Sequence, residues 1–269
     1  MIDDKEGWTK EVANTKVRFN RFKALTAVKR KDLPKGGKVM TTTWAMKKKA
    51  SGKLCGRLNA RGYEQVEGKH YVEHNTSAPV TNPITIRIIL TMMAMHAAWI
   101  AEVLDVDGAF LQGKFYNGEK LHIGISNGFE KWYDDVKVLL MNVLLYGTTQ
   151  VANCFYKMPV KRMTNKDYKR SKADPCLYYI YIDGRLVLMV SWVDDILILG
   201  HPVDVERVKE DLMKSFECTC EGALTEYVGS KIDIEQKTSG LVVVKFTQSV
   251  LVQKLQYECI EQLLVEKHQ

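Results

Sequence analysis

Long uncharged apolar runs are missing from this 269-residue sequence. The most apolar segment, residues 84–103, contains Arg87, His96 and Glu102, so it predicts a buried helix instead of a membrane span. The first residues are charged and have no apolar core of the kind found in signal peptides. We therefore expect a cytoplasmic protein that has no membrane partner.

Closely spaced cysteines are also scarce. The six cysteines are scattered along the chain, at Cys55, Cys154, Cys176, Cys218, Cys220 and Cys259. The closest pair is separated by one residue, which is the wrong spacing for a zinc knuckle, and reduced thiols are the expected state. Internal repeats and low-complexity tracts are absent as well.

The remaining composition is that of a globular protein with a slight basic excess. Hydrophobic residues make up 46% of the chain and charged residues 26%, which predicts one large or two small domains. The 39 Lys and Arg residues outnumber the 32 Asp and Glu residues, giving a formal charge of +7. This excess is suited to a polyanionic partner.

Local patterns predict alternating strands and helices. Strands are expected at residues 41–47, 54–63, 101–106, 121–125, 136–140, 177–182, 185–193, 196–199, 227–234 and 241–246. Helices are expected at residues 82–98, at 148–163 and after His201-Pro202. The first two strands, joined by a turn at residues 50–52, form a basic hairpin carrying Lys47, Lys48, Lys49, Lys53, Arg57 and Arg61. Its lysines fit either a solvated face or a template contact.

Two adjacent carboxylates, Asp194 and Asp195, interrupt the apolar run at residues 191–200. Two neighbouring carboxylates within an apolar run need a turn open to solvent, a cationic partner or a metal ion. A hairpin turn is the simplest local interpretation, because aspartates favour turns. Asp105 ends a second apolar strand. If the two strands pair, three carboxylates meet at one sheet edge, where oxygen ligands suit Mg²⁺ in the two-ion arrangement of polymerases.

Six segments, taken in order, carry a resemblance to a known family. They read RLNARGYEQVEG (57–68), LDVDGAFLQG (104–113), LYGTTQ (145–150), DPCLY (174–178), WVDD (192–195) and YVGSKI (227–232). Over residues 34–256 the chain resembles the reverse transcriptase of copia-type LTR retrotransposons, an RNA-dependent DNA polymerase of the Pol polyprotein. Any one segment is weak, and the ordered set is specific.

The resemblance implies a role for each matching residue. The metal ligands would be Asp105, Asp194 and Asp195 with the backbone of Val106, holding two Mg²⁺ ions or Mn²⁺ in their place. The incoming nucleotide would be held by Arg57, Arg61, Gln150 and Phe110, with Phe110 as the steric gate against a 2′-hydroxyl. Tyr227 and Gly229 would support the primer end. Taken singly, the arginines also fit solvated surface charges, Phe110 a core residue and Gln150 a surface amide.

The resemblance also implies a fold and a set of partners. We expect an α+β right-hand polymerase with a poorly matching segment at 1–33, fingers at 34–100 and a palm at 101–235. The palm would be an antiparallel sheet with helices on one face. Residues 236–256 would begin a largely missing thumb, and 257–269 would be a tail. The expected partners are a template-primer of RNA and DNA, dNTPs and other parts of a Gag-Pol polyprotein. The expected location is a virus-like particle.

Several positions depart from the family pattern. Cys55 stands where a basic residue is usual, Leu144 replaces a proline, Thr149 a lysine and Trp192 a tyrosine. Two other functions stay open. The departures favour the first, a decayed transposon relic that at most binds nucleic acid. The second is a metal-dependent nuclease, which uses similar carboxylates but has no use for a steric gate.

Overall fold

The computed structural model describes residues 5–35, 37–48, 52–113, 115, 120–133, 138–164, 166–249 and 251–257. The chain forms two compact units, each made of two separate stretches. The first unit contains Met1–Pro79 and Gly108–Asn165, and the second contains Val80–Asp107 and Lys166–Gln269. Helices and mainly antiparallel strands occur in both, which confirms a mixed α and β fold. The finer subdivision into fingers and palm stays a prediction.

The first unit combines two small sheets with three helices in its described part. Its elements are α1 (Lys5–Arg21), β1 (Leu25–Val28), β2 (Val39–Met40), β3 (Thr42–Lys48), β4 (Leu54–Ala60), α3 (Ala109–Gln112), β6 (Leu121–Ile123), β7 (Val138–Met141) and α4 (Val151–Thr164). Short 3₁₀ turns lie at Arg30–Asp32, Gly62–Glu64, Glu73–Asn75 and Glu130–Trp132. One sheet has the order β1-β7-β6-β2, and β3 and β4 form the predicted antiparallel hairpin. The lysines Lys47, Lys48 and Lys53 are exposed, whereas Lys49 and the predicted turn residues Ala50 and Ser51 lie outside the described residues.

Aromatic packing closes the core of the first unit. Phe129 is fully buried, and Phe19 of α1 and Trp44 of β3 meet its ring edge to face, with centroids 6.1 and 5.8 Å away. The local sequence does not predict α1, because only Thr15 and Phe19 of its 17 residues are buried. Tertiary packing of this narrow stripe stabilises the helix.

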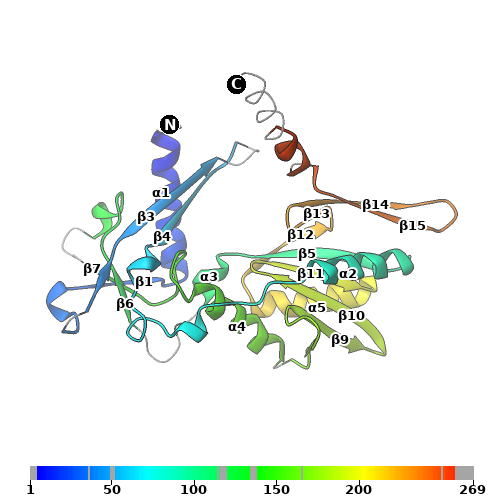
Figure 1. The fold of residues 1–269 in the computed structure, drawn as a ribbon, viewed down its shortest axis with the longest axis horizontal. Helices are drawn as coiled ribbons and strands as arrows, with labels where there is room; N and C mark the ends of the chain where they lie inside the picture. Colours follow the sequence, from blue (N-terminus) through cyan, green and yellow to red (C-terminus); the bar gives the residue numbers. More distant parts are fainter. Residues whose placement is uncertain are drawn as a thin grey trace, which may run out of the picture. The chain divides into compact units, whose positions relative to one another are not determined.

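The second unit is built on a six-stranded antiparallel sheet (Figure 1). Its elements are α2 (Pro83–Met95), β5 (Ile100–Val106), β8 (Lys169–Arg170), β9 (Leu177–Ile182), β10 (Arg185–Trp192), β11 (Asp195–Gly200), α5 (Pro202–Ser215), β12 (Cys218–Ala223), β13 (Glu226–Tyr227), β14 (Ser230–Gln236) and β15 (Val242–Thr247). The large sheet has the order β12-β5-β11-β10-β9-β8, and β13-β14-β15 form a second sheet. Thus the strand expected at 101–106 and both expected central hairpins are confirmed.

Local signals explain where these elements begin and turn. The side chain of Asn82 accepts a hydrogen bond from the backbone N–H of Ile84 (2.9 Å), and Pro83 occupies the first turn of α2, as predicted. Asp183 and Gly184 both have positive φ angles, 51° and 78°, which is the geometry of the tight hairpin between β9 and β10.

Helices cover both faces of the large sheet (Figure 1), so the expectation of helices on one face is wrong. The apolar side of α2 packs against Val103, whereas Lys209 of α5 donates a hydrogen bond to the neighbouring Glu102 (3.0 Å). Successive side chains of a strand point to opposite faces. Strand β11 is buried from Ile196 to Gly200, and a strand that is apolar on both faces needs a layer on each. Within the described residues, no helix is long and apolar enough to cross a bilayer.

Candidate active site

The hairpin of β10 and β11 presents two carboxylates at its tip. Trp192 and Asp195 face each other as the last paired residues, leaving Val193 and Asp194 as the turn. Val193 has a φ angle of 52°, in the left-handed region that a β-branched residue rarely adopts. Backbone strain of this kind is frequent at functional sites. The tip is therefore the predicted turn, and its backbone is strained at Val193.

Strand β5 brings the third carboxylate to this tip. Asp105 is the partner of Asp195 in the antiparallel register of β5 and β11. The backbone N–H of Val106 donates to the carbonyl oxygen of Asp194 (2.7 Å). The strand pairing expected from the sequence is confirmed, and all three carboxylates belong to one end of this strand pair.

The electrostatics of the tip are those of crowded negative charge. Burial, with the charges of Asp194 and Asp105, raises the pKa of Asp195 to about 6, and Glu221 and Glu226 add to the effect. These four neighbours are all acidic. A cation bound at this end of the sheet would relieve the repulsion.

The donor chemistry fits a hard divalent cation. Carboxylate oxygens are the ligands that Mg²⁺ and Mn²⁺ prefer, and Asp105 and Asp195 are directly opposed across two strands. In the described part of the chain, no three His, Cys, Asp or Glu side chains form a preassembled metal-binding group. The binding of two divalent metal ions therefore stays a prediction based on the type and charge of the donor groups.

Strand β12 adds a neighbour that the sequence did not predict. Thr219 is paired with Asp105, and Cys218 lies beside it on the edge strand. Burial and the nearby charges of Cys220 and Asp105 raise the pKa of the Cys218 thiol. A short, half-exposed strand with alternating polar residues gives little periodic signal, so only the sheet reveals this contact.

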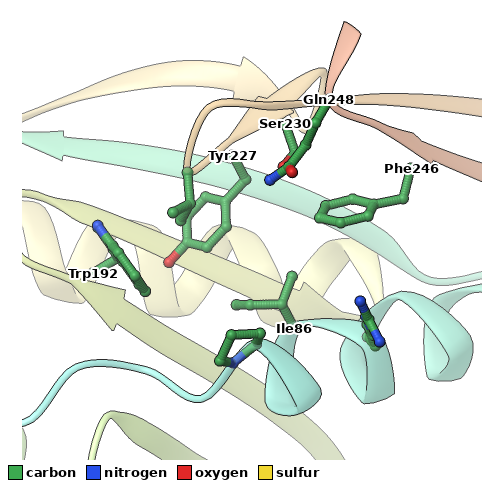
Figure 2. A pocket seen from close by; sticks show the side chains of 9 residues that line it. Ile86, Trp192, Tyr227, Ser230, Phe246 and Gln248 are labelled. Carbon is green, nitrogen blue, oxygen red and sulfur yellow. The ribbon is translucent and has the colours of Figure 1, made fainter. Parts of the chain in front are cut away.

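An aromatic pocket of about 460 Å³ adjoins the carboxylate hairpin within the second unit. Figure 2 shows Trp192, Tyr227 and Phe246 around it, with Ile86 on its floor and Gln248 at its rim. Tyr227 is 2% exposed, and its hydroxyl donates to the carbonyl oxygen of Val190 (3.2 Å). Such a pocket accepts flat or apolar groups.

The turn that carries Gly229 forms one wall of this pocket. Val228 and Gly229 have φ angles of 52° and 71°, and they connect β13 to β14 between the paired residues Tyr227 and Ser230. Both predicted primer-end residues therefore lie in one tight hairpin, with the side chain of Tyr227 fixed beneath it.

The predicted nucleotide-binding residues lie in the first unit. Arg57 is exposed on β4, and its guanidinium carbon is 5.1 Å from the centre of the Tyr146 ring. Phe110, in α3, meets the same tyrosine edge to face with ring centroids 4.8 Å apart. Arg57 and Phe110 are thus brought together through a residue to which the sequence analysis assigned no role.

Arg61 has a different environment. It lines a polar pocket of about 530 Å³ together with residues 41–44 and 124–127. The backbone N–H of Arg61 donates to the carbonyl oxygen of Thr41 (3.0 Å), and Glu64 accepts hydrogen bonds from the hydroxyl and the N–H of Thr41. Those hydrogen bonds are the main reason that the pKa of Glu64 is lowered, and Lys38 and Arg61 contribute less.

Gln150 is buried, with 2% of its surface exposed. Its side-chain oxygen accepts from Nε2 of Gln65 (2.8 Å), and its own Nε2 donates to the carbonyl oxygen of His70 (3.1 Å). The backbone N–H of Thr149 completes the network by donating to Gln65 (2.7 Å). The ordinary interpretation of Gln150 as a surface amide is wrong, because partners about 80 residues away in sequence satisfy its amide.

Two glycines hold the 145–150 segment against the end of β4. The N–H of Gly62 donates to the carbonyl oxygen of Gly147 (3.0 Å), and the N–H of Ala60 donates to that of Tyr146 (2.8 Å). A Cβ atom on Gly147 would lie 2.3 Å from the carbonyl oxygen of Ala60, and Gly147 has a φ of 84°. The close backbone approach explains why glycine stands at both positions.

Comparisons of the sequence with known proteins identify a family. The profile of a family described as "Reverse transcriptase (RNA-dependent DNA polymerase)" matches residues 25–260. The chain is 29% identical over 186 residues to the "Retrovirus-related Pol polyprotein from transposon RE1" of Arabidopsis thaliana. This alignment covers 69% of this chain and 12% of that polyprotein. The chain is 30% identical over 145 residues to the corresponding protein from transposon RE2, covering 54% of this chain and 10% of that polyprotein. The chain thus spans about a tenth of the length of these relatives.

Proposed function

Since the chain belongs to the reverse transcriptase (RNA-dependent DNA polymerase) family, we propose that it catalyses RNA-directed DNA synthesis as part of a copia-type Pol polyprotein. In this reaction the primer 3′-oxygen forms a bond to the α-phosphorus of a dNTP. The bond from that phosphorus to the bridging oxygen breaks, and pyrophosphate leaves. The single observation that carries the proposal is the register of β5 and β11, which opposes Asp105 and Asp195 beside Asp194.

The three carboxylates would serve as ligands for the divalent ions. Asp105 and Asp194 would be the principal ligands, with Asp195 and the backbone of Val106 in support. Two bound Mg²⁺ or Mn²⁺ ions would supply the acidification of the primer hydroxyl and the neutralisation of the leaving pyrophosphate. The raised pKa of Asp195 supports this assignment, because the neighbouring carboxylates Asp194 and Asp105 contribute to it, and a bound cation would offset their negative charge.

The first unit would bind the incoming nucleotide. The guanidinium of Arg57 is exposed and would pair with the triphosphate, while the ring of Phe110 would exclude a 2′-hydroxyl. Arg61 would add a second cation from its own pocket. Gln150 would act through the buried network that fixes residues 145–150, because both ends of its amide are already bonded to protein.

The primer end and the template would contact other surfaces. The pocket beside Trp192, with Tyr227 and Gly229, would support the last primer nucleotide. The lysines of the β3–β4 hairpin are exposed and would contact phosphates of a template-primer of RNA and DNA. Other segments of the Pol polyprotein, in a cytoplasmic virus-like particle, would complete the assembly.

A primer-extension assay tests the proposal. The protein is incubated with a labelled DNA primer on an RNA template, all four dNTPs and Mg²⁺, and EDTA serves as the control. Template-directed extension that EDTA abolishes supports the proposal. Salt-dependent binding of the template-primer without extension would favour the decayed relic, and shortening of the labelled primer would favour a nuclease.

A further inference from the structure

The ring of Tyr146 lies between two residues that the proposed function assigns to nucleotide recognition. Arg57 stacks its guanidinium against this ring at 5.1 Å, and Phe110 meets the ring edge to face at 4.8 Å. Phe155 meets Phe110 in a second edge-to-face contact, with ring centroids 5.7 Å apart. The three aromatic rings and the cation are thus linked by successive contacts within the first unit.

The backbone around Tyr146 holds this ring in place. Its carbonyl oxygen accepts the N–H of Ala60 (2.8 Å), the last residue of strand β4, which carries Arg57. The next residue, Gly147, accepts the N–H of Gly62 (3.0 Å). The backbone of Tyr146 is therefore bonded to the end of the strand that carries Arg57, and removal of the ring takes away its contacts with Arg57 and Phe110 while leaving these backbone bonds in place.

The contacts suit a positioning role. An arginine side chain has several rotatable bonds, and an aromatic face restricts them while leaving the guanidinium donors free to bind phosphate. An edge-to-face pair fixes the tilt of the second ring. One tyrosine can therefore orient both the cation for the triphosphate and the ring that screens the sugar.

We propose that Tyr146 is a positioning residue that couples triphosphate binding by Arg57 to sugar selection by Phe110. The inference rests on the proposed function, because it deepens the roles assigned there to Arg57 and Phe110. Loss of the ring weakens dNTP binding and, at the same time, reduces the preference for dNTP over rNTP. A residue that only stabilised the fold would not change that preference.

The test compares three variants of the full chain. Tyr146→Leu removes the ring, and Tyr146→Phe restores its face and edge. Tyr133→Leu is the matched control, because it removes the cation–π contact between Lys16 and Tyr133 (4.7 Å) elsewhere in the same unit. Steady-state extension gives KM and kcat with dATP and with ATP, and equilibrium binding of a fluorescent dATP or ATP gives Kd without turnover.

Tyr146→Leu is expected to raise KM and Kd for dATP about 3- to 10-fold, to affect KM more than kcat, and to lower the dATP-to-ATP preference about 3- to 10-fold. Tyr146→Phe is expected to restore wild-type preference, and Tyr133→Leu to leave the preference unchanged. An unchanged preference in Tyr146→Leu, an equal loss in Tyr133→Leu, or no triphosphate binding by the wild type would overturn the inference. Selective binding that depends on Tyr146 without any extension would instead refute only the proposed function.

Discussion

Asp195 combines a structural liability with the chemistry proposed for it. Its side chain is partly buried, and its pKa is raised to about 6 by that burial and by the charges of Asp194 and Asp105. The ionised form of this carboxylate is therefore less favourable in the folded chain than in the unfolded chain, which costs stability at neutral pH. Residues retained for function at a cost in stability are common in active sites.

Replacement of this carboxylate is therefore expected to stabilise the metal-free protein. At neutral pH and in EDTA, Asp195→Asn should raise the free energy of unfolding by about 1 to 3 kcal/mol, because it removes charge repulsion while keeping the side-chain shape. Urea denaturation measures the change. Asp183→Asn is the control, since that exposed carboxylate lies beside Arg207 (3.2 Å). A stability equal to or below that of the wild type would contradict the electrostatic description of the hairpin tip.

Among the elements, the join between β4 and residues 145–150 depends on the absence of a side chain at Gly147. Gly147→Ala would place a Cβ atom 2.3 Å from the carbonyl oxygen of Ala60, in addition to the strain of a left-handed backbone. Gly52→Ala is the matched control, because Gly52 has a similar φ of 80° with nothing within 4 Å of its Cβ position.

Gly147→Ala is expected to destabilise the first unit by about 2 to 4 kcal/mol, and Gly52→Ala by about 1 kcal/mol. Thermal unfolding followed by circular dichroism separates the two. An equal loss of stability in the two variants would mean that the left-handed backbone alone requires glycine at position 147. The close approach of the Ala60 carbonyl oxygen would then play no part.

A buried carboxylate at the start of α5 is expected to make the stability of the protein depend on pH in the acid range. Asp204 is fully buried and accepts hydrogen bonds from Arg185 at Nε (2.6 Å) and Nη2 (2.9 Å). The hydrogen bond from Arg185 is the main reason that the pKa of Asp204 is lowered, against the opposing effect of burial. A lowered carboxyl pKa contributes stability above the unfolded value of about 4, which is lost as the pH falls through the folded value.

The melting temperature of the wild type should therefore fall below about pH 4, and Asp204→Asn should show a shallower decline there. The variant is also expected to be less stable at pH 7, where the ion pair is complete. Melting temperatures measured from pH 2 to pH 7 test both expectations. Parallel curves for the two proteins would show that another carboxylate controls the acid transition.

Sequence patterns predicted the elements that have strong local signals. The Asn82-Pro83 start of α2 and the Asp183-Gly184 hairpin are confirmed because both depend on neighbouring residues alone. Edge strand β12 and helix α1 were not predicted, since each is stabilised by packing against distant strands. The burial of Gln150 could not be predicted, because its partners lie about 80 residues earlier in the chain.

At the scale of the whole molecule, the residues with proposed roles belong to two compact units. The cation and aromatic residues proposed to hold the nucleotide belong to the first unit, and the carboxylates and the primer pocket belong to the second. The boundaries that the sequence suggested, at residues 34, 101 and 236, stay a prediction, and the tail from residue 258 onward lies outside the described residues.

Because Arg57 is proposed to bind the nucleotide and the carboxylates to hold the metal ions, variants of Arg57 should change mainly KM for dNTP, and variants of the carboxylates mainly kcat. Steady-state primer extension measures both constants.

The most direct test of the central claim is Mg²⁺-dependent primer extension by Asp105→Asn and Asp194→Asn, with Asp107→Asn as the matched control. Asp107 follows the end of β5, where its backbone N–H donates to the carbonyl oxygen of Glu217 (2.9 Å), and it is not among the proposed ligands. We predict that each of the first two variants loses at least about 100-fold in kcat, and that Asp107→Asn retains activity close to that of the wild type. Extension that survives in both Asp105→Asn and Asp194→Asn would contradict the account.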